Sequence, residues 1–147
     1  MAIWDWVLEA YGRPGVPAAT LVLQDAHGQN TSYLLWAVHA QSDDPDLLAR
    51  AAEVARQWDR TALVPLREVR RGLKLALPPF ADRAREDLRD SVKGLELAAE
   101  RLLMETLDEM SPPSSGAGTL AVLEAASRAW GNPAPATALA DLAAALG

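Results

Sequence analysis

The sequence predicts an all-α fold, and three observations support this prediction. Alanine and leucine fill 52 of the 147 positions, and both residues favour helix formation. Apolar residues recur at helical rather than alternating spacing along most of the chain. Proline and glycine gather in a few short stretches that separate these periodic segments. We therefore expect a compact bundle of four to five helices, one of them long and kinked, followed by an alanine-rich helical tail.

The first forty residues are expected to form three short helices. Four apolar residues share one face of the first helix at helical spacing: Trp4, Val7, Leu8 and Tyr11. Pro17 suits the start of a second helix that runs to about His27. Asn30 is a typical N-cap for a third helix that ends near Ala40. Because residues 20–24 and 31–38 flank His27-Gly28, they could instead form the two strands of a β-hairpin.

A long kinked helix is expected next. Asp44 is placed to cap it, and Pro45 to open it. The apolar rhythm of this segment continues through Pro65 and ends at Pro78-Pro79. A proline inside a helix removes one backbone hydrogen bond and crowds the carbonyl four residues earlier. We therefore expect a kink at Pro65 rather than an end.

A second long helix is expected from about residue 80 to residue 110. Its apolar face is formed by five residues: Leu88, Val92, Leu95, Ala99 and Leu102. Residues 111–118 are expected to form a flexible linker, because they contain serine, proline and glycine almost exclusively. The sequence therefore predicts a helical domain over residues 1–110 and a weakly attached alanine-rich tail over residues 119–147.

Composition and charge exclude several functional classes. The chain has no cysteine, which removes disulfides, thiolate nucleophiles and cysteine-bound metals. Its net charge of −6 disfavours nucleic acid as a partner. No apolar run approaches the 18 residues that a membrane span requires, and the amino terminus lacks the basic stretch of a signal peptide. These features predict a cytoplasmic protein without a membrane partner.

One segment of this acidic chain is basic. Arg67, Arg70, Arg71 and Lys74 recur at helical spacing, and Arg60 extends their arc beyond Pro65. Because the planar guanidinium group binds carboxylates and phosphates well, this face could hold an anionic ligand or an acidic partner. The alternative is internal pairing with Glu96 and Glu100 of the following helix, or simple solvation.

A second polar cluster lies between the second and third predicted helices. It contains Asp25, His27 and Asn30, and a functional interpretation gives His27 a role in proton transfer. We favour the structural interpretation, in which Gly28 ends one helix and Asn30 caps the next. No histidine spacing typical of a metal site occurs, and no cofactor motif is present.

Four stretches of the first 110 residues resemble a proteobacterial family of proteins of unknown function, domain of unknown function 2390. They are WDWVLEAYGRPGV (4–16), LVLQDAHGQNTSYLLWA (21–37), LVPLREVRRGLK (63–74) and ELAAER (96–101). The chain has Thr31 where the family usually has valine. The resemblance implies an all-helical cytosolic domain and implies no activity.

The sequence leads us to expect a protein–protein interaction or adaptor module that uses the basic helix face. The alternative is an enzyme that binds a small anionic ligand or a nucleotide between the Asp25–Asn30 turn and Arg67, Arg70 and Arg71. No catalytic residue, metal or cofactor is predicted. The partner is expected to be a protein, and a homodimer is possible because the narrow leucine stripe of the tail could bind a second copy: Leu139, Leu142 and Leu146.

Overall fold

The computed structural model describes all 147 residues, which form helices and loops and no strand. The elements are α1 (Ile3–Tyr11), α2 (Val16–Asp25), α3 (Thr31–Ala40), α4 (Pro45–Trp58), η1 (Asp59–Leu63), α5 (Val64–Gly72), α6 (Asp82–Glu109), α7 (Thr119–Trp130) and α8 (Ala136–Leu146). The predicted all-α class is therefore confirmed. The β-hairpin alternative is wrong, since both of its segments are helical.

Two predicted helix starts carry the expected caps. The Asn30 side-chain oxygen accepts a hydrogen bond from the backbone N–H of Tyr33 at 2.9 Å and caps α3. The Asp44 carboxylate accepts one from the N–H of Asp46 at 3.1 Å and caps α4. Each cap satisfies a backbone donor that the first turn of a helix leaves without a partner.

The expected kinked helix runs without interruption from Pro45 to Gly72 as α4, η1 and α5. Its irregularity is the π-helical turn η1, in which the N–H of Val64 bonds to the carbonyl of Asp59, five residues earlier. Pro65 follows directly after this bond. Because proline cannot donate a hydrogen bond and crowds the preceding turn, the wider π turn accommodates it without ending the helix.

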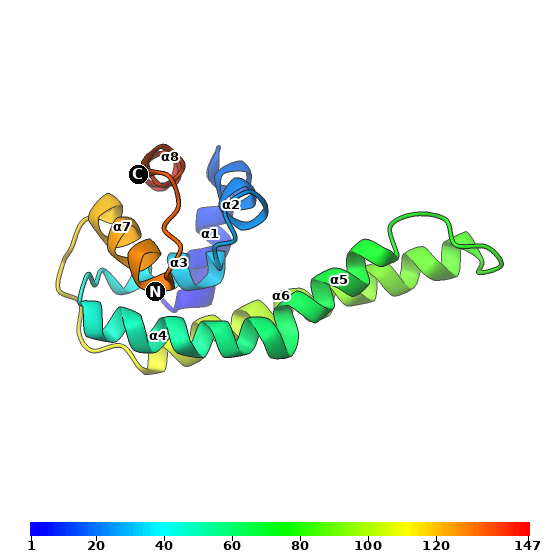
Figure 1. Cartoon of the computed structure of the whole chain (residues 1–147), viewed down its shortest axis with the longest axis horizontal. Helices are drawn as coiled ribbons and strands as arrows, with labels where there is room; N and C mark the ends of the chain where they lie inside the picture. Colours follow the sequence, from blue (N-terminus) through cyan, green and yellow to red (C-terminus); the bar gives the residue numbers. More distant parts are fainter.

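Most of the helices pack around α3 in a globular part that we call the head (Figure 1). Every residue of α3 except His39 is buried. Helices α1, α4, α7 and the C-terminal part of α6 surround it, and α2 and α8 pack side by side at one edge. The Tyr33 hydroxyl donates to the carbonyl of Ala126 at 2.9 Å, which joins the centre of the core to α7.

The alanine-rich tail is part of this core, so the expectation of weak attachment is wrong. The leucine stripe of α8 packs within the chain: Leu139, Leu142 and Leu146 are all buried. The Gln29 amide donates to the carbonyl of Asn132 at 2.8 Å, and its oxygen accepts a hydrogen bond from Ser127 at 2.9 Å. Ala145 of α8 lies directly against Gly15, which precedes α2. The small side chain of Ala145 therefore allows the two helices to approach closely.

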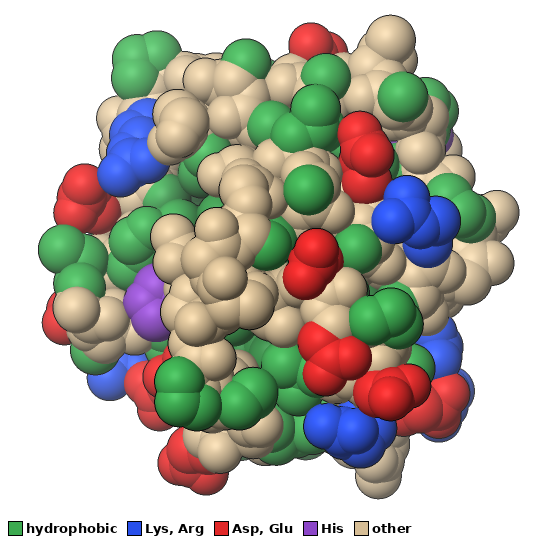
Figure 2. Space-filling model, turned by 90° about the vertical axis from the view of Figure 1, so that its left-hand side faces the viewer, with side chains coloured by type: hydrophobic (Ala, Val, Ile, Leu, Met, Phe, Trp, Pro, Cys, Tyr) green, Lys and Arg blue, Asp and Glu red, His purple; other side chains and the backbone are tan.

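The remaining residues form a helical hairpin that projects from the head (Figure 1). We call residues 64–98 the arm, which consists of α5, the connecting loop and the N-terminal part of α6. No residue of α5 is buried, and Arg85 and Val92 are the only buried residues of α6 before Ala99. The end of the head away from the arm carries interspersed apolar, acidic and basic side chains (Figure 2). None of the helices has the length and apolar composition needed to cross a membrane.

Candidate functional site

A polar cleft of about 320 Å³ opens where the arm joins the head. Helices α1, α2, α3 and α6 contribute its lining, which consists of Tyr11, Pro17, Thr20, Leu21, Gln24, Thr31 and Glu100. A smaller cavity of about 170 Å³ lies beside it along α6 and includes Arg70, Lys93 and Glu96. Glu100 lines both cavities. We call the two together the polar cleft, with Glu100 at its centre.

The carboxyl group of Glu100 has no hydrogen bond or ion pair with the rest of the chain. Burial, and to a smaller extent the neighbouring charge of Glu96, raises its pKa to about 7. The guanidinium groups of Arg67 and Arg70 act in the opposite direction. A carboxyl group with this pKa can accept or release a proton near neutral pH.

Tyr11 faces Glu100 across the cleft. Burial raises the pKa of the Tyr11 hydroxyl, and the charge of Glu100 raises it as well. The hydroxyl groups of Thr20 and Thr31 lie next to it and act in the opposite direction. Tyr11 therefore remains neutral and offers a hydroxyl group close to the carboxyl group of Glu100.

The structure brings the predicted arginines to this region and pairs them within the chain. Arg70 donates to Glu96 at 2.6 Å, which is the internal pairing considered as an alternative. Arg67 donates to the side-chain oxygen of Gln24 at 3.2 Å, and Arg71 donates to Asp25 at 3.1 Å. The other two predicted binding residues, Arg60 and Lys74, are exposed and form no ion pair.

The predicted cluster of Asp25, His27 and Asn30 does not converge on one point. Asp25 contacts Arg71, whereas the Asn30 amide donates to Asp59 at 2.9 Å in the interior. His27 lines a separate cavity between α2 and α8. Burial raises the pKa of Asp59, while Arg67 and the bond from Asn30 lower it.

The charges behind the polar cleft do not balance when Glu100 is ionised. The nearby guanidinium groups are those of Arg67 and Arg70, and the nearby carboxyl groups are those of Asp59, Glu96 and Glu100. Lys93, which lines the smaller cavity, pairs with Asp90 at 3.8 Å, so three positive groups in all face four acidic groups. In a partly desolvated site this excess favours either a proton on Glu100 or a cation beside it.

No group of three or more histidine, aspartate or glutamate side chains is placed to hold a metal ion. The second histidine, His39, lies in the head with Nε2 at 3.2 Å from the carbonyl oxygen of Met1. Its Nδ1 lies 3.6 Å from Asp108. Both contacts are structural and lie away from the polar cleft.

Sequence reasoning missed Tyr11, Thr20 and Thr31 as site residues and considered Glu100 only as a partner for arginine. No spacing pattern could have found these four residues, because each of them lies on a different helix. One signal was present, however. Each of the four stretches that carry the family resemblance supplies a polar side chain at or directly behind the cleft: Tyr11, Gln24, Arg67 and Glu100.

Comparison with known proteins gives one match. The model of a family described as "Protein of unknown function (DUF2390)" matches residues 2–107, and this is the family that the four stretches resemble. No curated protein and no solved structure matches the chain significantly. The match covers helices α1 to α5 and nearly all of α6, and it ends before the tail.

Proposed function

The chain belongs to the DUF2390 family, whose function is unknown, and we propose from the geometry of the polar cleft that it binds a small polar molecule carrying a basic nitrogen. Glu100 would receive the protonated nitrogen, and the hydroxyl groups of Tyr11 and Thr31 would orient the rest of the ligand. The observation that carries this proposal is the Glu100 carboxyl group, which faces the cleft without a partner from the chain.

The charge of the surroundings supports a cationic ligand. Ionised Glu100 leaves the cluster with one more acidic group than basic groups, and a single bound ammonium group restores the balance. A cation would also stabilise the ionised form of Glu100 against the effect of burial. Binding is therefore expected to release a proton from Glu100 at neutral pH.

The hydrogen bonds of the arginines favour a cationic ligand in the polar cleft over the anionic ligand or acidic partner protein expected from the sequence. An anionic ligand or an acidic partner protein would need guanidinium groups that are free to bind it. Of the predicted arginines only Arg60 is free, because the guanidinium groups of Arg67, Arg70 and Arg71 already donate to Gln24, Glu96 and Asp25. Such a ligand would have to break these hydrogen bonds first, which reduces the free energy that binding can gain.

Isothermal titration calorimetry with a panel of small amines, and with alcohols and phosphate esters of matched size, tests the proposal. We expect at least one amine to bind and the matched neutral and anionic compounds not to bind. Replacing Glu100→Gln should weaken amine binding about thirtyfold or more, because a partly buried charge pair is worth about 2 kcal/mol.

Glu109→Gln is the matched control, since Glu109 is an exposed glutamate on the same helix outside the cleft. It should bind amines as the wild type does. Titration in buffers of different ionisation enthalpy should show release of a proton from the wild type on binding. Absence of binding across the amines, or equal affinity in the Glu100→Gln variant, would overturn the proposal.

A further inference from the structure

The opposite flank of α6 carries an apolar stripe that stays exposed along its length, although Leu88 at one end also lines a cavity of about 370 Å³ with Leu73 and Phe80. The stripe consists of Ala84, Leu88, Ser91, Leu95, Ala98 and Leu102, all exposed. The three leucines are 55%, 57% and 53% exposed. The spacing alternates between four and three residues, which is the spacing of a coiled-coil seam, and the stripe extends about 27 Å along the helix. We call it the outer stripe.

We propose that the outer stripe is the interface of a homodimer, in which α6 of one copy packs antiparallel against α6 of a second copy. The alternation of large and small residues along the outer stripe is the first observation that favours a second copy of the chain as the partner. In an antiparallel pair with its two-fold axis at the level of Lys93, next to Gly94, each leucine faces a small residue of the other copy. The three facing pairs are Leu88 with Ala98, Leu95 with Ser91, and Leu102 with Ala84.

Charge is the second observation. Asp87 and Arg101 lie on the same side of the outer stripe and at equal distances in sequence from Gly94. The antiparallel pairing therefore brings Asp87 of each copy near Arg101 of the other. The guanidinium group of Arg101 also contacts Glu105 of its own helix, and Asp87 would join this pair, which gives two equivalent ion pairs across the interface. Gly94 lies directly beside the axis, next to Gly94 of the second copy. Its position is open, because a Cβ added there would have no atom within 4 Å.

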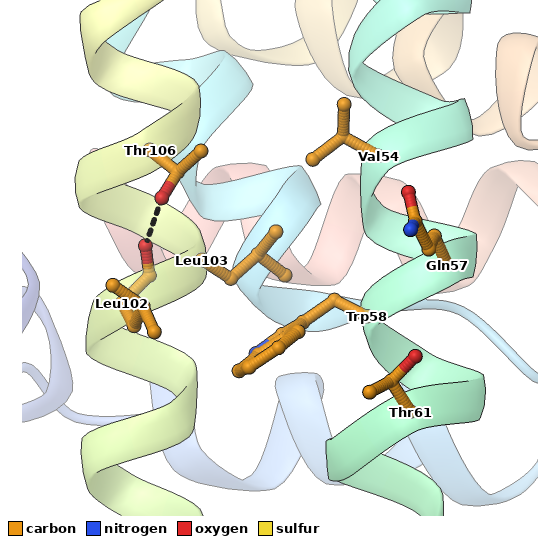
Figure 3. Close-up of a pocket in the computed structure, with 7 residues that line it drawn as sticks. All are labelled: Val54, Gln57, Trp58, Thr61, Leu102, Leu103 and Thr106. Carbon is orange, nitrogen blue, oxygen red and sulfur yellow. Dashed lines mark hydrogen bonds between the residues drawn. The ribbon is translucent and has the colours of Figure 1, made fainter.

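The two ends of the outer stripe provide the third observation. At the base, Leu102 and Thr106 of α6 and Trp58 and Val54 of α4 line a cavity of about 300 Å³ (Figure 3). At the tip of the arm, Phe80 is 67% exposed. The register that matches the leucines with the small residues also brings the start of α6 of the second copy, which Phe80 precedes by two residues, to this end of the outer stripe. An exposed aromatic ring at one end thus meets an apolar cavity at the other.

Figure 3 shows the side chains that line this cavity. The side chains of Leu102, Leu103 and Thr106 on α6 and of Trp58 on α4 enclose a space between the two helices. Trp58 is held in place because its indole N–H donates to the carbonyl of Ala99 at 2.9 Å. The polar cleft lies on the other flank of α6, so a dimer of this kind leaves it open, and the two proposals can be tested separately.

Sedimentation velocity and light scattering over a range of concentrations test the dimer. We expect the wild type to reach twice the mass of the 15.8 kDa chain as the concentration rises. Leu95→Asp should remain monomeric while keeping the helical circular dichroism of the wild type. A wild type that stays monomeric up to millimolar concentration would overturn the proposal, as would a Leu95→Asp variant that still dimerises.

The register is tested by exchanging charges. Asp87→Arg and Arg101→Asp should each dimerise more weakly than the wild type, because each places like charges together at both ends of the interface. A mixture of the two variants should form a heterodimer, in which each charge again meets its opposite. Failure of the mixture to associate more tightly than either variant alone would contradict the antiparallel register.

An introduced cysteine tests the axis, since the chain contains none. Gly94→Cys should form a covalent dimer under mild oxidation, with a short bis-maleimide as a second reagent if the two sulfurs are too far apart for a disulfide. Gly72→Cys is the matched control, because Gly72 is an exposed arm glycine with open space around it but lies on α5. Equal crosslinking at both positions would contradict the proposed axis.

Discussion

The head and the arm are built from the same kind of helix, but they differ in how much apolar surface they bury. In the head, α3 is enclosed on all sides, and 29 buried residues form one core. In the arm, α5 has no buried residue, and Leu88 and Leu95 of α6 are more than half exposed. Two helices alone cannot cover each other's apolar faces, because each offers only one flank to the other.

The difference shows that the two regions are stabilised in different ways. The head gains its stability from burial of large side chains, which is the dominant favourable contribution to folding. The arm is fixed by a few specific contacts: Arg70 with Glu96, Arg89 with the carbonyl of Arg70, and Arg85 with the carbonyl of Leu73. Its apolar flank therefore remains free for another molecule, while its polar flank contributes to the cleft.

The largest effect is expected in the head. Trp36 is fully buried, and its indole N–H donates to Ser111 at 2.9 Å. Replacing Trp36→Ala removes this contact and leaves a large cavity, so the free energy of unfolding should fall by about 3–5 kcal/mol. Urea denaturation followed by circular dichroism measures the change. A loss below about 1 kcal/mol would mean that the core around α3 is not the main source of stability.

The next effect is at the junction of head and arm, and it depends on pH. The folded state raises the pKa of Glu100 from 4.5 to about 7, so it binds a proton more tightly than the unfolded chain does. The stability that this proton provides is complete below pH 4.5 and is lost as the pH rises through 7. Relative to Glu100→Gln, the wild type should lose up to about 3 kcal/mol over this range.

Thermal unfolding of both proteins between pH 4.5 and pH 8.5 measures this difference. Glu109→Gln should follow the wild type, because its carboxyl group is exposed. If the difference between wild type and Glu100→Gln does not change with pH, burial does not perturb Glu100, and the proton release expected on ligand binding would also be absent.

A smaller and more local effect is expected at the tip of the arm. Arg85 is buried, donates to the carbonyl of Leu73 at 2.6 Å and lies between Asp82 and Glu86. Replacing Arg85→Ala releases the loop and should cost about 1–3 kcal/mol, since a charged hydrogen bond is lost. Limited proteolysis should then cut faster within residues 73–81 while the head stays intact. Arg83→Ala, at an exposed position without an ion pair, should leave the cutting rate unchanged.

The sequence predicted the helices better than their arrangement. The caps Asn30 and Asp44 and the passage through Pro65 depend on local interactions, and local spacing was enough to predict them. The packed tail was missed because its attachment depends on Gln29, which bonds to residues about a hundred positions away. The polar cleft was missed for the same reason, since Tyr11 and Glu100 meet only when α1 packs against α6.

The smallest effect on stability is expected at the centre of the outer stripe. Leu95 is 57% exposed in the single chain, so Leu95→Ala removes little buried surface and should change the free energy of unfolding by at most about 0.5 kcal/mol in dilute solution. At concentrations where the wild type dimerises, the same substitution should lower the melting temperature, because it weakens association that stabilises the folded state. Differential scanning calorimetry at low and high concentration separates the two contributions. A large loss at low concentration would instead show that Leu95 supports the arm itself, and that the arm, like the head, is stabilised mainly by its own burial.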